Sequence, residues 1–293
     1  MIVPMPSVSV IVPHYNDLDR LDQCLAALEV QTMPRSDYEI LVADNGTPAG
    51  LDAVRAVVRN RARLIEAPIP GAGPARNAGA AEAQGRILAF TDCDCVPEAH
   101  WLEEGVRALD MADFVGGRMT VTVRSPGHMS AAEAFETVFA FQNRSYVLKK
   151  HFTVTANLFC PAALFKDVGP FRTEVSEDKE WCLRARDKGY RIGYAEKAVV
   201  GHPARRNWRE LKRKWQRMSA ESYALMRERN GSSLCWLLRT WALPLSILPH
   251  AVCTLTDDRL PAIRDRAGAV GMLILSRLWR FAEGHRLLLR RGR

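Results

Sequence analysis

Several features are missing from this sequence of 293 residues, and each absence excludes a class of protein. Its seven cysteines are an odd number and include no Cys-x-x-Cys pair, so a disulfide scaffold is excluded and reduced thiols in a cytoplasmic setting are expected. No basic segment precedes the first apolar run, which prolines interrupt, so we expect no targeting peptide. A hydrophobic content of 47% is ordinary for a globular chain with a buried core.

Positive charge is concentrated in the last third of the chain. Residues 204–293 hold 19 Lys and Arg against 7 Asp and Glu, whereas residues 1–203 hold 22 against 26. A mildly acidic body with a basic tail indicates an anionic partner for the tail, either lipid head groups or nucleic acid.

In the first hundred residues, β-branched runs alternate with amphipathic helical segments. Such alternation predicts an α/β fold with a mostly parallel, Rossmann-type central sheet flanked by helices. Ligands of such sheets bind beyond the carboxyl ends of the strands. The expected strands cover residues 7–13, 38–43, 62–66 and 86–91, and the expected helices cover 18–28, 51–59 and 74–84.

Polar side chains gather at that edge of the expected sheet, namely Tyr15, Asp44, Arg76, Asp92 and Asp94. Asp92 and Asp94 are two residues apart at a strand exit, where strand alternation would point both carboxylates to one side. This spacing suits Mg²⁺ or Mn²⁺ shared with substrate phosphates, and the alternative is an ordinary solvated turn. The neighbouring Cys93 and Cys95 are expected to face the core.

Residues 71–79, Gly-Ala-Gly-Pro-Ala-Arg-Asn-Ala-Gly, match neither the dinucleotide-binding fingerprint nor the Walker pattern. They nevertheless open an expected helix, and a helix N-terminus with Arg76 in its first turn is suited to receive a diphosphate. The alternative is a flexible connection between a strand and a helix.

Further candidates lie in the second half of the chain. Asn157 precedes an apolar stretch, and Glu177 and Asp178 begin an expected helix. His202 follows an expected strand. Each has a structural alternative, because carboxylates at a helix start complement its dipole and a lone histidine is more often structural than a ligand.

Six short motifs occur in a fixed order along residues 7–220. They are Val-Pro-His-Tyr-Asn, Ala-Asp-Asn-Gly, Pro-Ala-Arg-Asn-x-Gly, Thr-Asp-Cys-Asp, Glu-Asp-x-Glu-x-Cys-x-Arg and Gly-His. In this order they resemble glycosyltransferase family 2, whose members have the GT-A fold. The resemblance implies an inverting enzyme that uses a nucleotide sugar and a divalent cation, Mg²⁺ or Mn²⁺.

The resemblance also implies roles for individual residues. The donor nucleotide would be bound by Pro13, Tyr15, Asp44, Arg76 and Asp92, and the cation by Asp94, Asp92 and His202. Asp178 would be the catalytic base, with Glu177 beside it on the acceptor side, where Asn157 also falls. The Gln-x-x-Arg-Trp motif of processive synthases is missing and Arg213-Lys214-Trp215 is only a partial echo of it, so a single transfer is expected.

The tail combines basic and aromatic residues. Trp208 and Trp215 are seven residues apart and would share one face of a helix. Residues 234–255 are largely apolar, but Arg239, Pro244 and Pro249 make them poorly suited to span a membrane. Basic amphipathic helices commonly lie in a membrane interface. The alternatives are packing on the catalytic domain or on a second subunit, and nucleic-acid binding, for which no motif is recognised.

These observations predict a catalytic domain over residues 1–220, with a nucleotide-sugar half at 1–115 and an acceptor half at 116–220, and a helical, membrane-associating tail at 221–293. The expected enzyme transfers a sugar, by default from a UDP-sugar, to a hydroxyl of a lipid-linked or surface-polysaccharide acceptor. It would act at the cytoplasmic face of the cell membrane. The sequence leaves open whether two copies form a homodimer.

Two other functions are compatible with the same fold. A sugar-1-phosphate nucleotidyltransferase would need a Gly-rich loop with Lys or Arg near the start of the chain, and that loop is missing. A non-catalytic, membrane-associated protein that binds nucleotide or glycan would not need the set of Asp92, Asp94, Asp178 and His202, which is intact.

Overall fold

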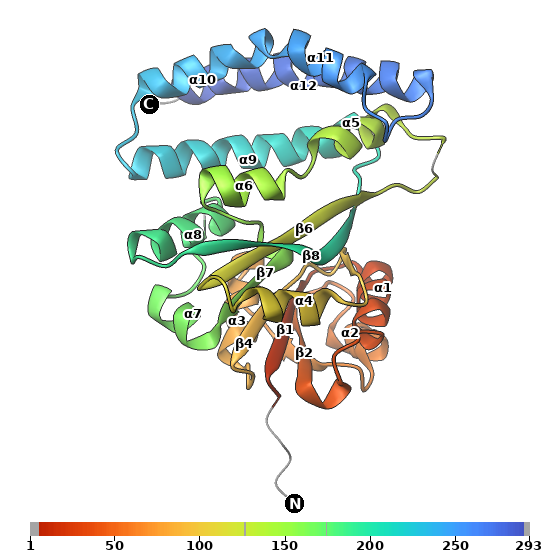
Figure 1. Ribbon diagram of the computed structural model, residues 1–293, viewed down its shortest axis with the longest axis vertical. Helices are drawn as coiled ribbons and strands as arrows, with labels where there is room; N and C mark the ends of the chain where they lie inside the picture. The colour runs from red at the N-terminus through yellow and green to blue at the C-terminus, as the bar shows by residue number, and fades with distance from the viewer. Residues whose placement is uncertain (1–5, 126, 174, 290–293) are drawn as a thin grey trace, which may run out of the picture. The chain divides into compact units, whose positions relative to one another are not determined.

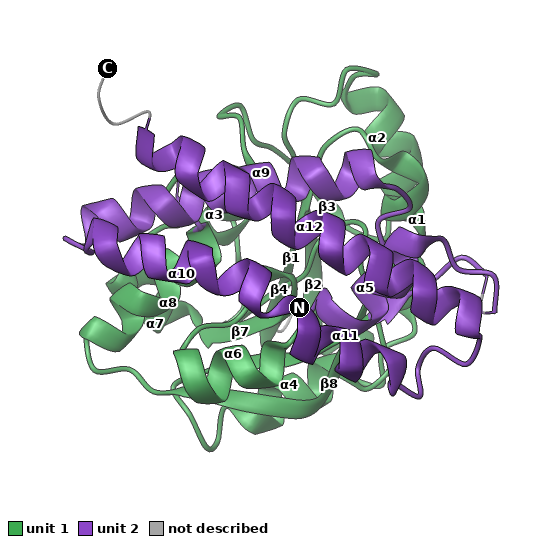
Figure 2. Ribbon diagram, turned by 90° about the horizontal axis from the view of Figure 1, so that it is seen from above, with its two compact units in different colours: residues 1–120, 142–173, 177–202 green, residues 121–141, 174–176, 203–293 purple. Residues whose placement is uncertain are grey.

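The computed structural model describes residues 6–125, 127–173 and 175–289. The chain forms two compact units, each built from several segments (Figure 2). Unit 1 comprises residues 1–120, 142–173 and 177–202, and unit 2 comprises residues 121–141, 174–176 and 203–293.

A sheet of eight strands, in the order β3-β2-β1-β4-β7-β6-β8-β5, organises the described part of unit 1 (Figure 1). The first four strands of this order are parallel to their neighbours, as expected. The pairs β4–β7, β7–β6 and β8–β5 are antiparallel. The strands are β1 (Val8–His14), β2 (Tyr38–Asp44), β3 (Arg63–Glu66), β4 (Ile87–Phe90), β5 (Val96–Pro97), β6 (Phe114–Thr122), β7 (Leu158–Pro161) and β8 (Ile192–Pro203).

The order of the strands creates a topological switch point. The chain proceeds from β1 to β2 and β3 on one side, and then returns as β4 on the other side of β1. At such a reversal, the loops beyond the carboxyl ends of the two central strands separate and leave a crevice for a ligand. The ends of β1 and β4 are therefore where a bound substrate is expected in this sheet.

Helices connect and cover the strands of unit 1. One of them, α3, packs on β1 and β2, and Gly79 allows the close approach because a Cβ there would lie 2.7 Å from Cγ2 of Ile11. The helices of unit 1 are α1 (Leu18–Glu29), α2 (Leu51–Val58), α3 (Ala72–Ala81), α4 (Trp101–Ala108), α6 (Asn143–Lys150), α7 (Ala162–Val168) and α8 (Glu177–Asp187).

Aromatic side chains fill the core between the sheet and helices α7 and α8. Phe90, Phe165, Phe171 and Trp181 pack with ring centroids 5.3–5.7 Å apart. The indole of Trp181 is fully buried, and its Nε1 donates a hydrogen bond of 2.9 Å to the carbonyl of Gly169. Because Trp181 lies one turn after the start of α8, this packing fixes the position of that start.

Apart from the ends of β6 and β8, the regular secondary structure in the described part of unit 2 is helical. Helix α12 contacts the other four, and Phe135 of α5, Leu211 of α9 and Leu273 of α12 meet in a shared apolar core. Trp208 and Trp215 both pack against this core, so the face that they share points into unit 2. The helices are α5 (Ala131–Phe139), α9 (Trp208–Glu228), α10 (Ser233–Leu245), α11 (Ile247–Leu255) and α12 (Ile263–Leu289).

The apolar stretch at residues 234–255 is divided between α10 and α11. Pro244 lies inside α10, and Ser246 both ends α10 and precedes α11. Among the residues that the structure describes, no helix is both long enough and apolar enough to cross a membrane.

In the Arg213-Lys214-Trp215 sequence, Lys214 belongs to a buried ionic cluster. Nζ of Lys214 lies 2.7 Å from Oε1 of Glu136, whose other oxygen accepts a hydrogen bond of 2.7 Å from the backbone N–H of Arg205. Burial lowers the pKa of Lys214 to about 8, against the opposing effect of Glu136. Lys214 is thus a structural cation within unit 2.

Candidate active site

Most of the expected site residues lie at the carboxyl ends of strands or at helix starts in unit 1. Pro13 is buried in β1, and Tyr15, directly after that strand, is 58% exposed. Asp44 ends β2, Arg76 lies in α3, and Asp92 and Asp94 follow β4. Glu177 and Asp178 are the first two residues of α8, and His202 lies near the end of β8.

The carboxylate of Asp44 is buried and held by hydrogen bonds from two residues. Its Oδ1 lies 2.7 Å from Nδ1 of His14 and 2.6 Å from the hydroxyl of Thr47, and its Oδ2 accepts from the backbone N–H of Thr47 at 3.0 Å. Nε2 of His14 accepts a hydrogen bond from the N–H of Asp17 at 3.2 Å. Nδ1 therefore carries the ring proton and donates it to Asp44.

These contacts determine the charge of Asp44. Burial alone would raise its pKa, but hydrogen bonds from Thr47 and His14 outweigh burial and lower the pKa below the ordinary value of 3.8. A carboxylate has about four lone-pair sites, and three of them are used here, so one is left to accept a hydrogen bond from a ligand.

Arg76 joins two carboxylates from distant parts of the sequence. Its guanidinium is 4% exposed, with Nη2 2.5 Å from Oδ1 of Asp92 and Nη1 hydrogen-bonded to Oε1 of Glu177. Burial opposes the charged form, but the two carboxylates outweigh it and raise the pKa of Arg76. Gly73 leaves room for Glu177, because a Cβ at that position would lie 2.6 Å from Oε2.

The residue after Arg76 makes a parallel connection. The side chain of Asn77 donates to the carbonyl of Phe171 and accepts from its N–H, both at 2.8 Å. The Pro-Ala-Arg-Asn sequence therefore ties the first half of α3 both to the segment ahead of α8 and to α8 itself.

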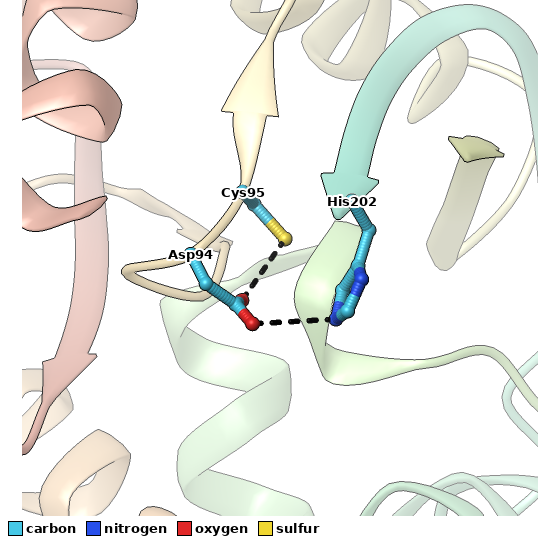
Figure 3. Close-up of side chains that lie close together, drawn as sticks. All are labelled: Asp94, Cys95 and His202. Atoms are coloured by element: carbon cyan, nitrogen blue, oxygen red, sulfur yellow. Dashed lines mark hydrogen bonds and ion pairs between the residues drawn. The ribbon is translucent and has the colours of Figure 1, made fainter. Parts of the chain in front are cut away.

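Asp92 and Asp94 do not share one partner. Strand β4 ends at Phe90, and a turn closed by a hydrogen bond of 3.0 Å from Cys95 N–H to Asp92 O follows, so the expected strand alternation does not apply. Asp92 contacts Arg76, whereas Oδ2 of Asp94 lies 3.5 Å from Nε2 of His202 (Figure 3).

The residues around Asp94 fit a divalent cation. One ligand atom each from Asp94, Cys95 and His202 lies within 4.8 Å of the others. Carboxylate oxygen and imidazole nitrogen are suitable ligands for Mn²⁺, and for Mg²⁺ the carboxylate is the suitable one. Among the described residues, the group of side chains close enough to hold an ion here does not include Asp92, which was expected to be a ligand, and it does include Cys95, which was not.

Two other expected residues differ in exposure. Asp178 is half-buried in the first turn of α8. Asn157 is fully buried, and its carboxamide accepts from the indole of Trp101 at 2.9 Å and donates to the carbonyls of Arg118 and Ala198. Asn157 thus holds the 3₁₀ turn before β7 to β6, β8 and α4 and does not reach the surface.

Sequence reasoning gave no role to three residues of this site. His14 stands inside the Val-Pro-His-Tyr-Asn motif, yet only the fold places it beside Asp44. Thr47 has a local signal, since a residue with a hydroxyl three positions after an aspartate often closes a turn. Asn45 binds the backbone of Ala67, Ile69 and Gly71 and so fixes the entry to α3.

Comparison with known proteins decides the family. Residues 9–168 match the model of glycosyl transferase family 2. The chain is also 33% identical over 289 residues to glycosyltransferase AglE of Haloferax volcanii, and the match covers 95% of this chain and 94% of that protein. This chain belongs to glycosyltransferase family 2. It is a glycosyltransferase, which excludes the nucleotidyltransferase and the non-catalytic alternatives.

Solved structures show the same GT-A fold. The mannosyltransferase PcManGT of Pyrobaculum calidifontis, in complex with GDP-Man and Mn²⁺, has a TM-score of 0.63 at 19% identity, covering 99% of this chain and 89% of that chain. TarS of S. aureus, residues 1–349 in complex with UDP, has a TM-score of 0.53 at 22% identity, covering 73% of this chain and 65% of that chain. The match spans 39% of a longer TarS structure.

The network around Asp44 predicts a pH-dependent stability. Because its pKa is lowered, the ionised carboxylate stabilises the fold above pH 3.8, and this contribution is lost as the pH falls through the lowered value. We expect Asp44→Asn to reduce the free energy of unfolding at pH 7 by about 1.5–3 kcal/mol, the size of a hydrogen bond to a charged group. The difference from the wild type should be constant above about pH 5 and should shrink as the pH falls below 3.8, as measured by urea unfolding at each pH.

The matched control is Asp52→Asn, because Asp52 is 96% exposed in α2 and pairs with Arg55 at the surface. It should leave the unfolding free energy within about 0.5 kcal/mol of the wild type. A difference between wild type and Asp44→Asn that stayed constant from pH 7 to pH 3 would contradict the assignment.

Proposed function

We propose that this family 2 enzyme transfers one sugar from a nucleotide sugar to a hydroxyl of a lipid-linked or surface-polysaccharide acceptor, with inversion and with Mg²⁺ or Mn²⁺. The observation that carries the proposal is the pairing of Asp94 with His202 at 3.5 Å. Asp94 follows β4, as does Asp92, which contacts the guanidinium of Arg76. Two motifs that are far apart in the sequence thereby supply one cation site.

The donor lies along the ends of β1, β2 and β4. Asp44 accepts a hydrogen bond from an imide or amide N–H of the base, which uracil and guanine offer. This choice agrees with PcManGT, solved with GDP-Man, and with TarS, solved with UDP, and a UDP-sugar is the default donor. Pro13 and the exposed ring of Tyr15 line the nucleoside side, and Arg76 and Asp92 lie on the ribose and diphosphate side.

Asp94 and His202 would hold the cation, which would supply positive charge beside the departing nucleoside diphosphate. PcManGT was solved with Mn²⁺, in agreement with a divalent ion here. Asp92 acts beside this site, because one of its oxygens is bonded to Arg76.

Asp178 is the catalytic base. As the acceptor oxygen attacks the anomeric carbon, its proton passes to the carboxylate of Asp178 and the bond to the diphosphate breaks on the opposite side. One base without a protein nucleophile gives a single displacement and therefore inversion. Glu177, fixed by Arg76, orients the start of α8, and Asn157 supports the acceptor side from within the core.

Replacing Asp178 by Asn tests the assignment of the base. The variant cannot accept the proton, so turnover should fall by at least about a hundredfold, while donor binding measured by calorimetry stays within about twofold. Asp187→Asn is the control, because Asp187 is an aspartate in the last turn of the same helix, paired with Arg186 at the surface. Turnover by Asp178→Asn close to the wild-type value would contradict the role.

The described tail also carries an exposed apolar stripe along α10 and α11. Its seven large side chains recur every three or four residues and are 44–76% exposed. Ser246, between the two helices, has φ −77° and ψ −6°, close to helical values, so the face continues from one helix to the next. The apolar stripe consists of Leu234, Leu238, Trp241, Leu245, Leu248, Val252 and Leu255.

An anionic membrane surface is the occupant that fits the apolar stripe. Exposed apolar faces of this kind mark contacts with membranes or proteins. A second copy would bring another basic segment, since residues 204–293 hold 19 basic and 7 acidic residues, and the two segments would repel each other, whereas anionic lipids attract them. The enzyme therefore works peripherally, at the cytoplasmic face, where a lipid-linked acceptor is at hand.

Exchanging both Leu245 and Leu248 for Glu tests the membrane contact. Each leucine is about 75% exposed, and loss of even one such contact corresponds to about a tenfold change in affinity. Flotation with phosphatidylglycerol vesicles should recover the wild type but not the variant. Met111→Glu, at an apolar residue of unit 1 that is 83% exposed, should float like the wild type. Equal flotation of all three proteins, or a wild-type dimer that the double exchange converts to monomers, would contradict the proposal.

A further inference from the structure

A buried thiol lies beside the proposed cation site. Cys95 is completely buried, and its Sγ lies 3.8 Å from Oδ1 of Asp94 (Figure 3). Cys93, only two residues away, is half-buried and is not part of the cluster of Asp94, Cys95 and His202. The turn after β4 therefore presents one of its two thiols to the cation site and not the other.

The distances among the three side chains agree with a tetrahedral site. With Zn–S of about 2.3 Å, and Zn–N and Zn–O of about 2.1 Å, the edges of a tetrahedron are roughly 3.4–3.6 Å long. The observed separations are 3.5 Å between Asp94 Oδ2 and His202 Nε2, and 3.8 Å between Cys95 Sγ and Asp94 Oδ1. These two separations are measured to different oxygens of Asp94, but one ligand atom from each of the three residues lies within 4.8 Å of the others, so the three side chains are close enough to bind one ion after adjustment.

The three ligand types differ in the ions that they select. Carboxylate oxygen suits Mg²⁺ and Mn²⁺, whereas sulfur together with nitrogen suits Zn²⁺, Co²⁺ and similar ions. Affinity for such a site rises from Mn²⁺ to Co²⁺ and is higher for Zn²⁺ than for Mn²⁺. A thiol within reach of Asp94 and His202 thus adds a preference for Zn²⁺ and Co²⁺ that the carboxylate and imidazole alone do not give.

We infer that Cys95 is a third protein ligand that lets the Asp94–His202 site bind a thiophilic divalent cation, Zn²⁺ or Co²⁺, in competition with Mg²⁺ or Mn²⁺. The inference rests on the proposed cation site. On binding, the Cys95 thiol loses its proton to solvent and its sulfur forms the bond to the metal. Thiolate and carboxylate together then neutralise the charge of the ion, so the zinc-loaded site attracts a diphosphate less strongly than the manganese-loaded one.

Cobalt is a direct probe of this bond, because a thiolate bound to Co²⁺ gives a charge-transfer absorption in the near ultraviolet. Titration of the wild-type protein with Co²⁺ should produce that band at one equivalent. The band should be lost in Cys95→Ser and retained in Cys93→Ser, which is the matched control. No band in the wild type, or a band of equal intensity in Cys95→Ser, would overturn the inference.

A second measurement needs no variant. X-ray absorption of the zinc-loaded wild-type protein should show one sulfur neighbour at about 2.3 Å, and a first shell of oxygen and nitrogen alone would overturn the inference. Failure of the proposed function is distinguishable, because it would appear as donor binding that does not depend on Mn²⁺. In contrast, failure of the inference would leave Mn²⁺-dependent donor binding intact and remove only the sulfur signal.

Discussion

The site in unit 1 depends on one buried positive charge, the guanidinium of Arg76. The guanidinium of Arg76 is nearly inaccessible to solvent and contacts carboxylates from the β4 exit and from the first turn of α8. A buried charge is stable in a protein only when it is paired, and removal of one partner of such a pair destabilises by about 3–5 kcal/mol. Arg76 therefore requires Asp92 and Glu177 to stay close together, and it requires Gly73 to have no side chain.

This constraint links the parts of the proposed reaction. Asp92 precedes Asp94 by two residues, and Glu177 precedes Asp178 by one, so the proposed cation ligand and the proposed base each lie within two residues of a carboxylate that Arg76 binds. Asn77 is hydrogen-bonded to the backbone of Phe171, and Trp181 packs in the aromatic core. These two contacts also hold the start of α8 and the segment before it. The proposed cation site and the proposed base thus owe their positions to the contacts of Arg76, Asn77 and Trp181.

The sequence predicted the parallel half of the sheet well, because the expected strands at residues 7–13, 38–43 and 62–66 are each followed by an expected helix. It predicted a strand ahead of His202, which belongs to β8, but it predicted neither β6 and β7 nor the antiparallel pairing. The resemblance implied one cation site for Asp94 and His202, which lie 3.5 Å apart, whereas the turn from Asp92 to Cys95 gives Asp92 and Asp94 different partners. Local sequence does not encode where β4 stops, because Thr91 is as compatible with a strand as Phe90. The positions of His14 and Cys95 likewise depend on contacts across the sheet that no local pattern contains.

Metal-dependent binding of a nucleotide sugar tests the central claim most directly. Calorimetric titration of the wild type and of Asp94→Asn with UDP-sugars and GDP-sugars, in Mn²⁺ and in EDTA, compares the donor and the cation in one experiment. The account predicts that one nucleotide class binds the wild type in Mn²⁺, and that binding is at least about tenfold weaker in EDTA and in Asp94→Asn, a loss of about 1.4 kcal/mol or more. Binding of equal strength in all four conditions would contradict it.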